Sequence, residues 1–321
     1  MHKISPIPLI GTLSMFFAEV FSGASQTWFI NGWGILVTFP LYLAHLLFFL
    51  AIAMRTKRTS LSQLYLFGVM FALYEAWITK VLWAGYMDTE GPSLGTFLGL
   101  DVAEFPVLVL FWHPIMSFIV PILVFEILTG KTLVQHSEIL KRSGRKTIVI
   151  TLLLILLSSF IANGNGFDPV LAIMSVAGSL LIIAVLYRLS KGTDIAQLVP
   201  GKRGFRVLCL YLLALYMITF MFLLPERIPT TIAPYISIIC FYMIAIALLS
   251  RSEKGIVQII QLEDKDYSPR NFVMFIPVLI LAVIIACLVP NISTNVLMLT
   301  YFSLIITGTV MFVSVVRNII K

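Results

Sequence analysis

The chain has 321 residues, of which 60% are hydrophobic and 12% are charged, and its mean hydropathy is +1.01. This composition excludes an ordinary soluble domain and a disordered chain, and it predicts an integral membrane protein. The formal net charge is +7, but the basic residues gather in loops between apolar segments. We therefore assign the charge to a membrane surface and expect no nucleic-acid partner.

About ten segments are long enough for bilayer-spanning helices, which need ~20 apolar residues each. They are residues 6–23, 35–54, 64–87, 106–129, 147–164, 168–187, 205–224, 230–250, 271–290 and 294–316. Segments this long and continuously apolar are typical of helices and not of barrel strands. We predict an all-α, polytopic helical bundle that forms a single membrane domain over residues 1–321.

The basic residues predict the orientation of this bundle. With ten spans, nearly all of the 22 Lys and Arg residues fall on the side that holds both termini; Lys80 and Arg227 are the exceptions. By the positive-inside rule that side is cytoplasmic. We expect a multi-pass protein of the cell membrane, with both termini in the cytoplasm and anionic lipids against its inner face. The predicted outer loops are acidic and contain Asp88, Glu90, Asp101, Glu104, Asp168 and Glu226.

The ionisable residues within spans lie in the first part of the chain. A charge near the bilayer centre costs about 2.5–3.5 kcal/mol, so such residues indicate a site. We therefore divide the domain into a four-helix half with the polar site, residues 1–146, and a six-helix apolar scaffold, residues 147–321. The intramembrane residues are Glu19, His45, Glu75, Lys80, His113 and Glu126.

Three connecting segments carry further expectations. Residues 24–34, ASQTWFINGWG, are aromatic and predict either an interfacial belt or the rim of a pocket. Residues 88–105 mix acids, glycines and apolar residues, and we expect a re-entrant or interfacial segment over the third and fourth spans. Residues 253–266 place isoleucines at helical spacing, which predicts an amphipathic helix on the inner membrane surface.

Depth along the helices suggests which polar residues meet. At 1.5 Å per residue, Glu75 lies near the midplane, and Lys80, His113 and Glu19 lie further out. A cluster of these four, open to the outer side, is the predicted site. Glu75 and Lys80 are about 140° apart around a helix, so each should face a different neighbour. A buried carboxylate is a suitable general base, so we assign Glu75 this role with His113 and Lys80 as electrostatic partners.

Nearby residues complete the predicted site. Pro114 lacks an N–H and leaves the Leu110 carbonyl without its helical partner, beside His113. His45 and Glu104 are assigned supporting polar roles. Glu104 also fits a purely structural role, because a carboxylate at a helix start favours the positive end of the dipole. Glu126 lies about one turn from the inner surface, where it is expected to reach toward lipid head groups.

The stretch EAWITK at residues 75–80 resembles the first motif, E-E-x-x-x-R, of CPBP-type intramembrane glutamic proteases, which are bacterial relatives of CAAX-processing enzymes. Ala76 stands at the second Glu and Lys80 at the Arg. The resemblance implies that Glu75 activates water for peptide hydrolysis. It also implies that His113, on the next span, orients the water or the oxyanion.

The rest of that family's pattern is met in part. Val109 stands where the family has the Phe of F-x-x-x-H before the histidine. Asn163 and Asn165 are the polar residues nearest the place of the family's later histidine motif.

Three functions are compatible with these residues. The first is a membrane-embedded hydrolase or transferase acting on a lipid or a membrane peptide. The second is a proton-coupled transporter, and the third is a non-catalytic subunit whose polar residues pair with another membrane protein. The sequence contains no nucleotide fingerprint, phosphate loop or metal-ligand spacing, so we expect neither cofactor nor metal.

Overall fold

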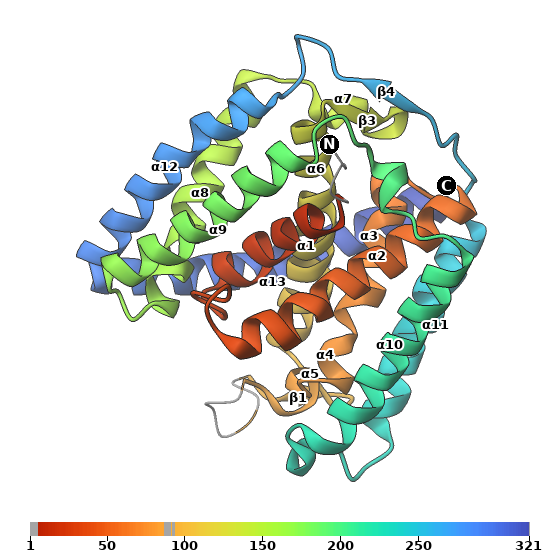
Figure 1. Cartoon of the computed structure of the whole chain (residues 1–321). Coiled ribbons are helices and arrows are strands. Elements are labelled where there is room, and N and C mark those ends of the chain that lie inside the picture. The colour runs from red at the N-terminus through yellow and green to blue at the C-terminus, as the bar shows by residue number, and fades with distance from the viewer. Residues whose placement is uncertain (1–5, 87–90, 92–93, 321) are drawn as a thin grey trace. The chain divides into compact units, whose positions relative to one another are not determined.

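The computed structural model describes residues 6–86, 91 and 94–320 (Figure 1). Within this part, eight helices are long and apolar enough to cross a bilayer. They are Gly34–Thr56, Phe105–Thr129, Gly144–Gly164, Pro169–Leu189, Lys202–Phe222, Ala233–Arg251, Pro269–Leu288 and Pro290–Ile320. The predicted all-α, polytopic membrane fold is confirmed. The orientation stays a prediction, and four of the charges it uses, Lys3, Asp88, Glu90 and Lys321, lie outside the described residues.

The other two predicted spans differ from expectation. The first is a short helix, Ile7–Val20, made of α1 (Ile7–Met15) and the π-helix η1 (Phe16–Val20). The third, predicted over 64–87, is broken into α3 (Leu61–Ala72), α4 (Tyr74–Trp77) and α5 (Val81–Ala84).

The chain forms two compact units, each built from three stretches of sequence. The first unit comprises residues 6–46, 120–199 and 256–302, and the second comprises 47–119, 200–255 and 303–320. Helices α2 (Phe39–Thr56) and α13 (Pro290–Ile320) contribute to both units. The predicted division at residue 147 concerns where the polar site lies, and it stays a prediction.

In the first unit, α12 (Pro269–Leu288) packs against α8 (Gly144–Gly164) and α9 (Pro169–Leu189), as Figure 1 shows. The short helix α1 packs against α6 (Val120–Thr129) and α9. The remaining elements of this unit are η2 (Gly34–Thr38), η4 (Val134–His136), α7 (Ser137–Leu140) and η5 (Ile195–Leu198).

Two strands of the first unit overturn one prediction. Strand β4 (Ile259–Gln261) pairs antiparallel with β3 (Lys131–Leu133), with Thr132 opposite Ile260. The amphipathic helix predicted for residues 253–266 is therefore wrong. The isoleucines there match helical spacing, but strand pairing with a distant segment determines the local conformation.

In the second unit, α3 packs along the π-helix η3 (Phe105–Ile119), and α11 (Ala233–Arg251) packs against α3. The unit also contains α10 (Lys202–Phe222) and η6 (Pro225–Arg227). Between α5 and η3, strands β1 (Thr96–Phe97) and β2 (Leu100–Asp101) form a hairpin. Leu98 and Gly99 both have positive φ, as a two-residue type I′ turn requires. This hairpin occupies part of the segment predicted to be re-entrant or interfacial.

The aromatic segment 24–34 is partly internal. Trp28 is buried, its ring stacks on Phe39, and its indole N–H donates to Ser179 at 3.1 Å. Trp33 is 56% exposed, as a residue of an interfacial belt would be. The two tryptophans therefore differ: Trp28 anchors the segment to α9, and Trp33 faces outward.

Candidate functional site

Three polar side chains of the second unit form a buried hydrogen-bonded row. Nε2 of His113 lies 2.9 Å from Oε1 of Glu75, and Nδ1 of His113 lies 2.9 Å from Oγ of Ser117. All three residues are buried. The predicted contact between Glu75 and His113 is therefore present in the structure. Ser117 adds a third member, so the hydrogen bonds connect Glu75 to His113 and His113 to Ser117.

The broken third span places Glu75 opposite the imidazole. The α3 helix ends at Ala72, and Glu75 lies in the first turn of α4. His113 and Ser117 lie four residues apart on η3, so they share one face of that helix. The rings of Phe71 and Tyr74 pack on His113 with centroids 5.7 and 5.1 Å away. These contacts fix the position of the imidazole.

Close approach of α3 and η3 depends on a small residue. A Cβ added at Gly68 would lie 2.5 Å from Cα of Pro114. The Tyr65 hydroxyl donates to the Leu110 carbonyl at 2.5 Å, which joins α3 to η3 beside Pro114. The loss of a helical partner at Leu110 was predicted for an α-helix, whereas in a π-helix the backbone donor to this carbonyl is five residues on and is not Pro114. The π-helical geometry of η3, which widens the backbone around His113, was not predicted.

A second layer of hydroxyl groups surrounds the Glu75 carboxylate. The Thr79 hydroxyl donates to Oε2, and the Tyr74 side chain also hydrogen-bonds this carboxylate. Tyr216 hydrogen-bonds Tyr242, which also interacts with Trp77. The carboxylate is thus surrounded by hydrogen-bond donors, as a buried acid requires.

The donor and acceptor in each hydrogen bond of the row follow from the charge of Glu75. An ionised Glu75 only accepts hydrogen bonds, so Nε2 of His113 carries its proton. In the neutral imidazole Nδ1 is then an acceptor, and the Ser117 hydroxyl donates to it. A carboxylate, an imidazole and a hydroxyl in this order can remove a proton from the hydroxyl while the carboxylate stabilises the imidazolium.

Lys80 does not join this row. Its ammonium group donates to the carbonyls of Thr219, at 3.0 Å, and Leu223, at the C-terminal end of α10. Lys80 itself has φ +60°, a left-handed conformation at the start of α5. Glu75 and Lys80 face different neighbours, as expected, but the 140° separation of a continuous helix does not apply because the helix is broken between them. The contacts of Lys80 are those of a cation at a helix C-terminus, in place of the predicted partnership with Glu75.

Glu19 belongs to the first unit and has its own partners. Its Oε1 accepts from the Tyr42 hydroxyl and its Oε2 from the Ser25 hydroxyl, each at 2.5 Å. The predicted convergence of Glu19 with Glu75 stays a prediction. His45, also of this unit, is buried, and its Nδ1 donates to the Leu41 carbonyl at 2.8 Å.

The backbone at the start of η3 is capped by Asp101, and the structural role predicted for Glu104 stays a prediction. Oδ1 of Asp101 accepts from the backbone N–H groups of Ala103, at 2.7 Å, and Glu104, at 3.0 Å. Glu104 is buried beside this cap. The N-terminal carboxylate that satisfies the backbone is therefore Asp101.

The first unit holds a second acid–imidazole pair. Nδ1 of His136 lies 2.9 and 3.0 Å from the two oxygens of Glu126, and neither side chain is exposed. The carboxylate also accepts from the Thr132 hydroxyl, at 2.8 Å, and the Leu133 backbone N–H, at 3.2 Å. The expectation that Glu126 reaches toward head groups is wrong, because β3 and His136 enclose it.

Several of these residues were missed from the sequence. Ser117 stands four residues after His113 and Thr79 four residues after Glu75, so both were detectable as same-face polar pairs. No local pattern connects His136 to Glu126. Among the described residues, no group of three or more His, Cys, Asp and Glu side chains is placed to hold a metal ion.

Fold and site together define a polytopic helical membrane protein with buried acid–imidazole pairs. A family model described as "Uncharacterized membrane protein family" matches residues 8–320, and the chain belongs to that family. The chain is 35% identical over 214 residues to an "Uncharacterized protein" of Archaeoglobus fulgidus. That alignment covers 65% of this chain and 66% of the relative, just under two thirds of its length. No solved structure matches the chain.

Proposed function

We propose that the protein is a membrane-embedded hydrolase or transferase that acts on an acyl bond of a lipid or of a membrane peptide. One observation carries this proposal: the buried row of Glu75, His113 and Ser117, with both imidazole contacts at 2.9 Å. Nucleophile, base and orienting carboxylate stand within hydrogen-bonding reach of each other in that order.

The proposed reaction assigns each group a role. The Ser117 hydroxyl attacks the acyl carbonyl carbon as Nδ1 of His113 takes its proton. Glu75 stabilises the resulting imidazolium through Nε2, and the imidazolium then protonates the leaving group. Water (hydrolysis) or a second acceptor (transfer) removes the acyl group from Ser117 by the same steps in reverse. Here Glu75 is an orienting group, whereas the resemblance to the glutamic proteases would make it the base that activates water.

A fluorophosphonate probe tests this assignment without knowledge of the substrate, because it labels serines activated by a base. Purified protein in detergent is incubated with the probe, and the labelled residue is located by mass spectrometry. We expect labelling at Ser117, and a labelling rate about 10²–10⁴-fold lower in Glu75→Gln and His113→Gln.

The control for this experiment is Ser175→Ala. Ser175 is also fully buried within a span, and its hydroxyl has no hydrogen-bond partner among the described residues. Ser175→Ala should label like the wild type, and Ser117→Ala should not label. Equal labelling of Ser117→Ala and the wild type would show that Ser117 is not the nucleophile. Water activation by Glu75 would then be tested by turnover of lipid or peptide substrates in Glu75→Gln.

The same row favours a second candidate, proton-coupled transport. Thr79, Glu75, His113 and Ser117 form a continuous hydrogen-bonded series, and the third span is broken beside it. Intramembrane acid and histidine residues serve as proton relays, and discontinuous helices line transport sites. Proteoliposomes that contain a pH-sensitive dye would test this candidate. Solute-driven proton flux that is lost in Glu75→Gln but kept in Ser117→Ala would favour transport over acyl chemistry.

A further inference from the structure

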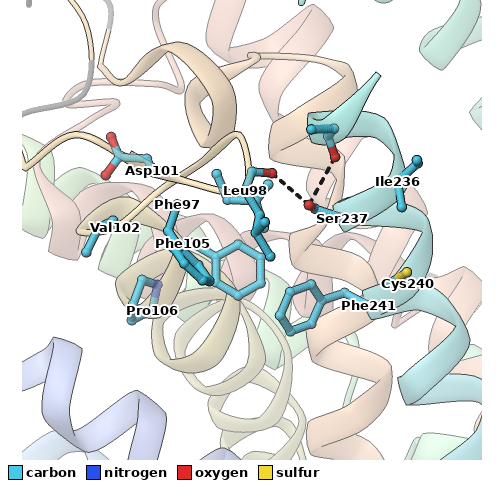
Figure 2. A pocket seen from close by; sticks show the side chains of 12 residues that line it. Phe97, Leu98, Asp101, Val102, Phe105, Pro106, Ile236, Ser237, Cys240 and Phe241 are labelled. Carbon is cyan, nitrogen blue, oxygen red and sulfur yellow. Dashed lines mark hydrogen bonds between the residues drawn. The ribbon is translucent and has the colours of Figure 1, made fainter. Parts of the chain in front are cut away.

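A cavity of about 590 Å³ in the second unit lies between the β1–β2 hairpin and the first turns of η3 and α11. Figure 2 shows Phe97, Leu98, Phe105 and Phe241 gathered around it, with Asp101 at its edge. Its size falls within the range of pockets that enclose a small ligand. None of these residues belongs to the Glu75 row.

The cavity is positioned at the ends of two spans. Phe105 begins one bilayer-spanning helix and Ala233 another, and both contribute to the lining. The cavity extends along α11 as far as Phe241, about 12 Å at 1.5 Å per residue. Its place along the spans is therefore the boundary between lipid head groups and lipid chains.

The open side of the cavity is apolar. Phe97 is 70% exposed and Leu98 is 64% exposed, although both belong to the hairpin and not to a span. Ile236 of α11 is 51% exposed and also contributes to the lining. Large apolar residues on a connecting hairpin are unfavourable in water, so this surface faces lipid.

Polar groups at the cavity are few and largely satisfied. The Ser237 hydroxyl lies 2.7 Å from the Leu98 carbonyl and 3.0 Å from the Ala233 carbonyl (Figure 2). Asp101 is the exception. It is 1% exposed, its Oδ1 caps η3, and its Oδ2 receives no hydrogen bond from the residues that the structure describes. This oxygen is enclosed by the protein, so it offers no contact to a ligand in the cavity, and the surface left for a ligand is apolar.

We infer that this cavity binds one hydrocarbon chain of a bilayer lipid. The apolar lining and its continuity with the lipid-facing side of α11 select a hydrocarbon chain. The inference is independent of the proposed acyl chemistry, because it uses different residues.

Photocrosslinking in vesicles tests whether a hydrocarbon chain of a lipid occupies the cavity. The full-length protein is reconstituted in phosphatidylcholine vesicles that contain a trace of phosphatidylethanolamine carrying a diazirine in its acyl chain. Crosslinks are then located by mass spectrometry. We expect them to concentrate on the hairpin and on residues 233–241. In Ile236→Trp the new ring occupies the cavity, and crosslinking there should fall about tenfold, as expected if roughly two CH₂ groups lose their burial.

Ile239→Trp is the matched control. Ile239 lies on the same helix with nearly the same exposure, 52%, and does not line the cavity. It should keep the wild-type crosslinking. Equal crosslinking of the two tryptophan variants, or crosslinks spread evenly over the lipid-facing helices, would overturn the inference.

Discussion

His136 places its Nδ1 between the two oxygens of the Glu126 carboxylate, at 2.9 and 3.0 Å, with no exposed surface on either side chain. This pair differs from the pair of Glu75 and His113 in its surroundings. The carboxylate of Glu126 also accepts from β3, whereas His113 faces a serine hydroxyl on its other nitrogen. The first pair therefore joins α6 to β3 and to His136, whereas the imidazole of the second pair lies between a carboxylate and a hydroxyl.

Loss of the Glu126 carboxylate should destabilise the protein. In Glu126→Ala, the donors on Thr132, Leu133 and His136 lose their acceptor, and breaking a buried pair costs about 3–5 kcal/mol. We expect the apparent Tm in detergent, followed by intrinsic fluorescence, to fall by several degrees. Glu253→Gln changes an exposed acid and should leave the Tm within the error of the measurement. An unchanged Tm in Glu126→Ala would contradict a stabilising role for the Glu126–His136 pair.

Lys80→Met separates a structural from a catalytic role. The substitution keeps the length of the side chain but removes the donor from the Thr219 and Leu223 carbonyls, and leaving a buried acceptor unsatisfied costs about 1–3 kcal/mol. The Tm should fall, and fluorophosphonate labelling of Ser117 should persist. Lys202→Met is the control, because Lys202 is exposed at the start of α10, the helix whose end Lys80 contacts. Loss of labelling with an unchanged Tm would show that Lys80 contributes to the reactivity of Ser117 and not to stability.

Gly68→Ala should weaken the contact between α3 and η3. The new Cβ would lie 2.5 Å from Cα of Pro114, and overpacking of this kind costs about 1–3 kcal/mol. Because Pro114 adjoins His113, the rate of Ser117 labelling should fall along with the Tm. Gly144→Ala places its Cβ in open space at the start of α8 and should not lower the Tm. Equal Tm values for the two variants would show that the helices separate without cost.

Acid should weaken two ion pairs outside the spans. The Lys141 ammonium, through a hydrogen bond and its charge, lowers the pKa of Glu138 from its ordinary value, and Lys265 does the same to the pKa of Glu263. A carboxylate with a lowered folded-state pKa stabilises the fold above its ordinary pKa of 4.5, and this contribution is lost as the pH falls below that value.

For Lys265, the basic partner in the second pair, stability depends on pH with the opposite sign. The hydrogen bond and charge of Glu263 raise the pKa of Lys265, so its contribution is present below the ordinary pKa of 10.5 and is lost at higher pH. Both groups are exposed, so the slopes of Tm against pH should be shallow and should vanish in high salt. Lys265→Gln should flatten the slope at high pH and reduce it at low pH, where the Lys141–Glu138 pair remains. An unchanged slope in this variant would contradict the contribution of the Lys265–Glu263 pair.

The sequence was sufficient where a feature depends on composition or on near neighbours. Apolar length predicted eight of the ten spans that we expected. The distance along the sequence between Glu75 and His113, on successive apolar segments, predicted that their side chains meet. These features follow from local geometry, which a single sequence contains.

Features made by distant segments could not be predicted. The stretch from Leu73 to Lys80 contains neither Gly nor Pro, yet the helix breaks there while Lys80 binds the end of α10, about 140 residues further along the chain. The π-helices at Glu19 and His113 likewise have no marker in single-sequence patterns. For β4, the isoleucine spacing fits a helix, and only the presence of β3 decides otherwise.

The pairing of β3 with β4 also constrains biosynthesis. Translation at 5–20 residues per second delivers Gln261 on the order of 10 s after Lys131, because about 130 residues separate the two. During that interval β3 has an unpaired edge, with the Glu126 and His136 pair beside it. The nascent chain must insert α8, α9, α10 and α11 before this edge is covered. Insertion factors or chaperones that recognise exposed strand edges could bind β3 in this period. In a chain truncated before residue 259, the edge of β3 would stay unpaired.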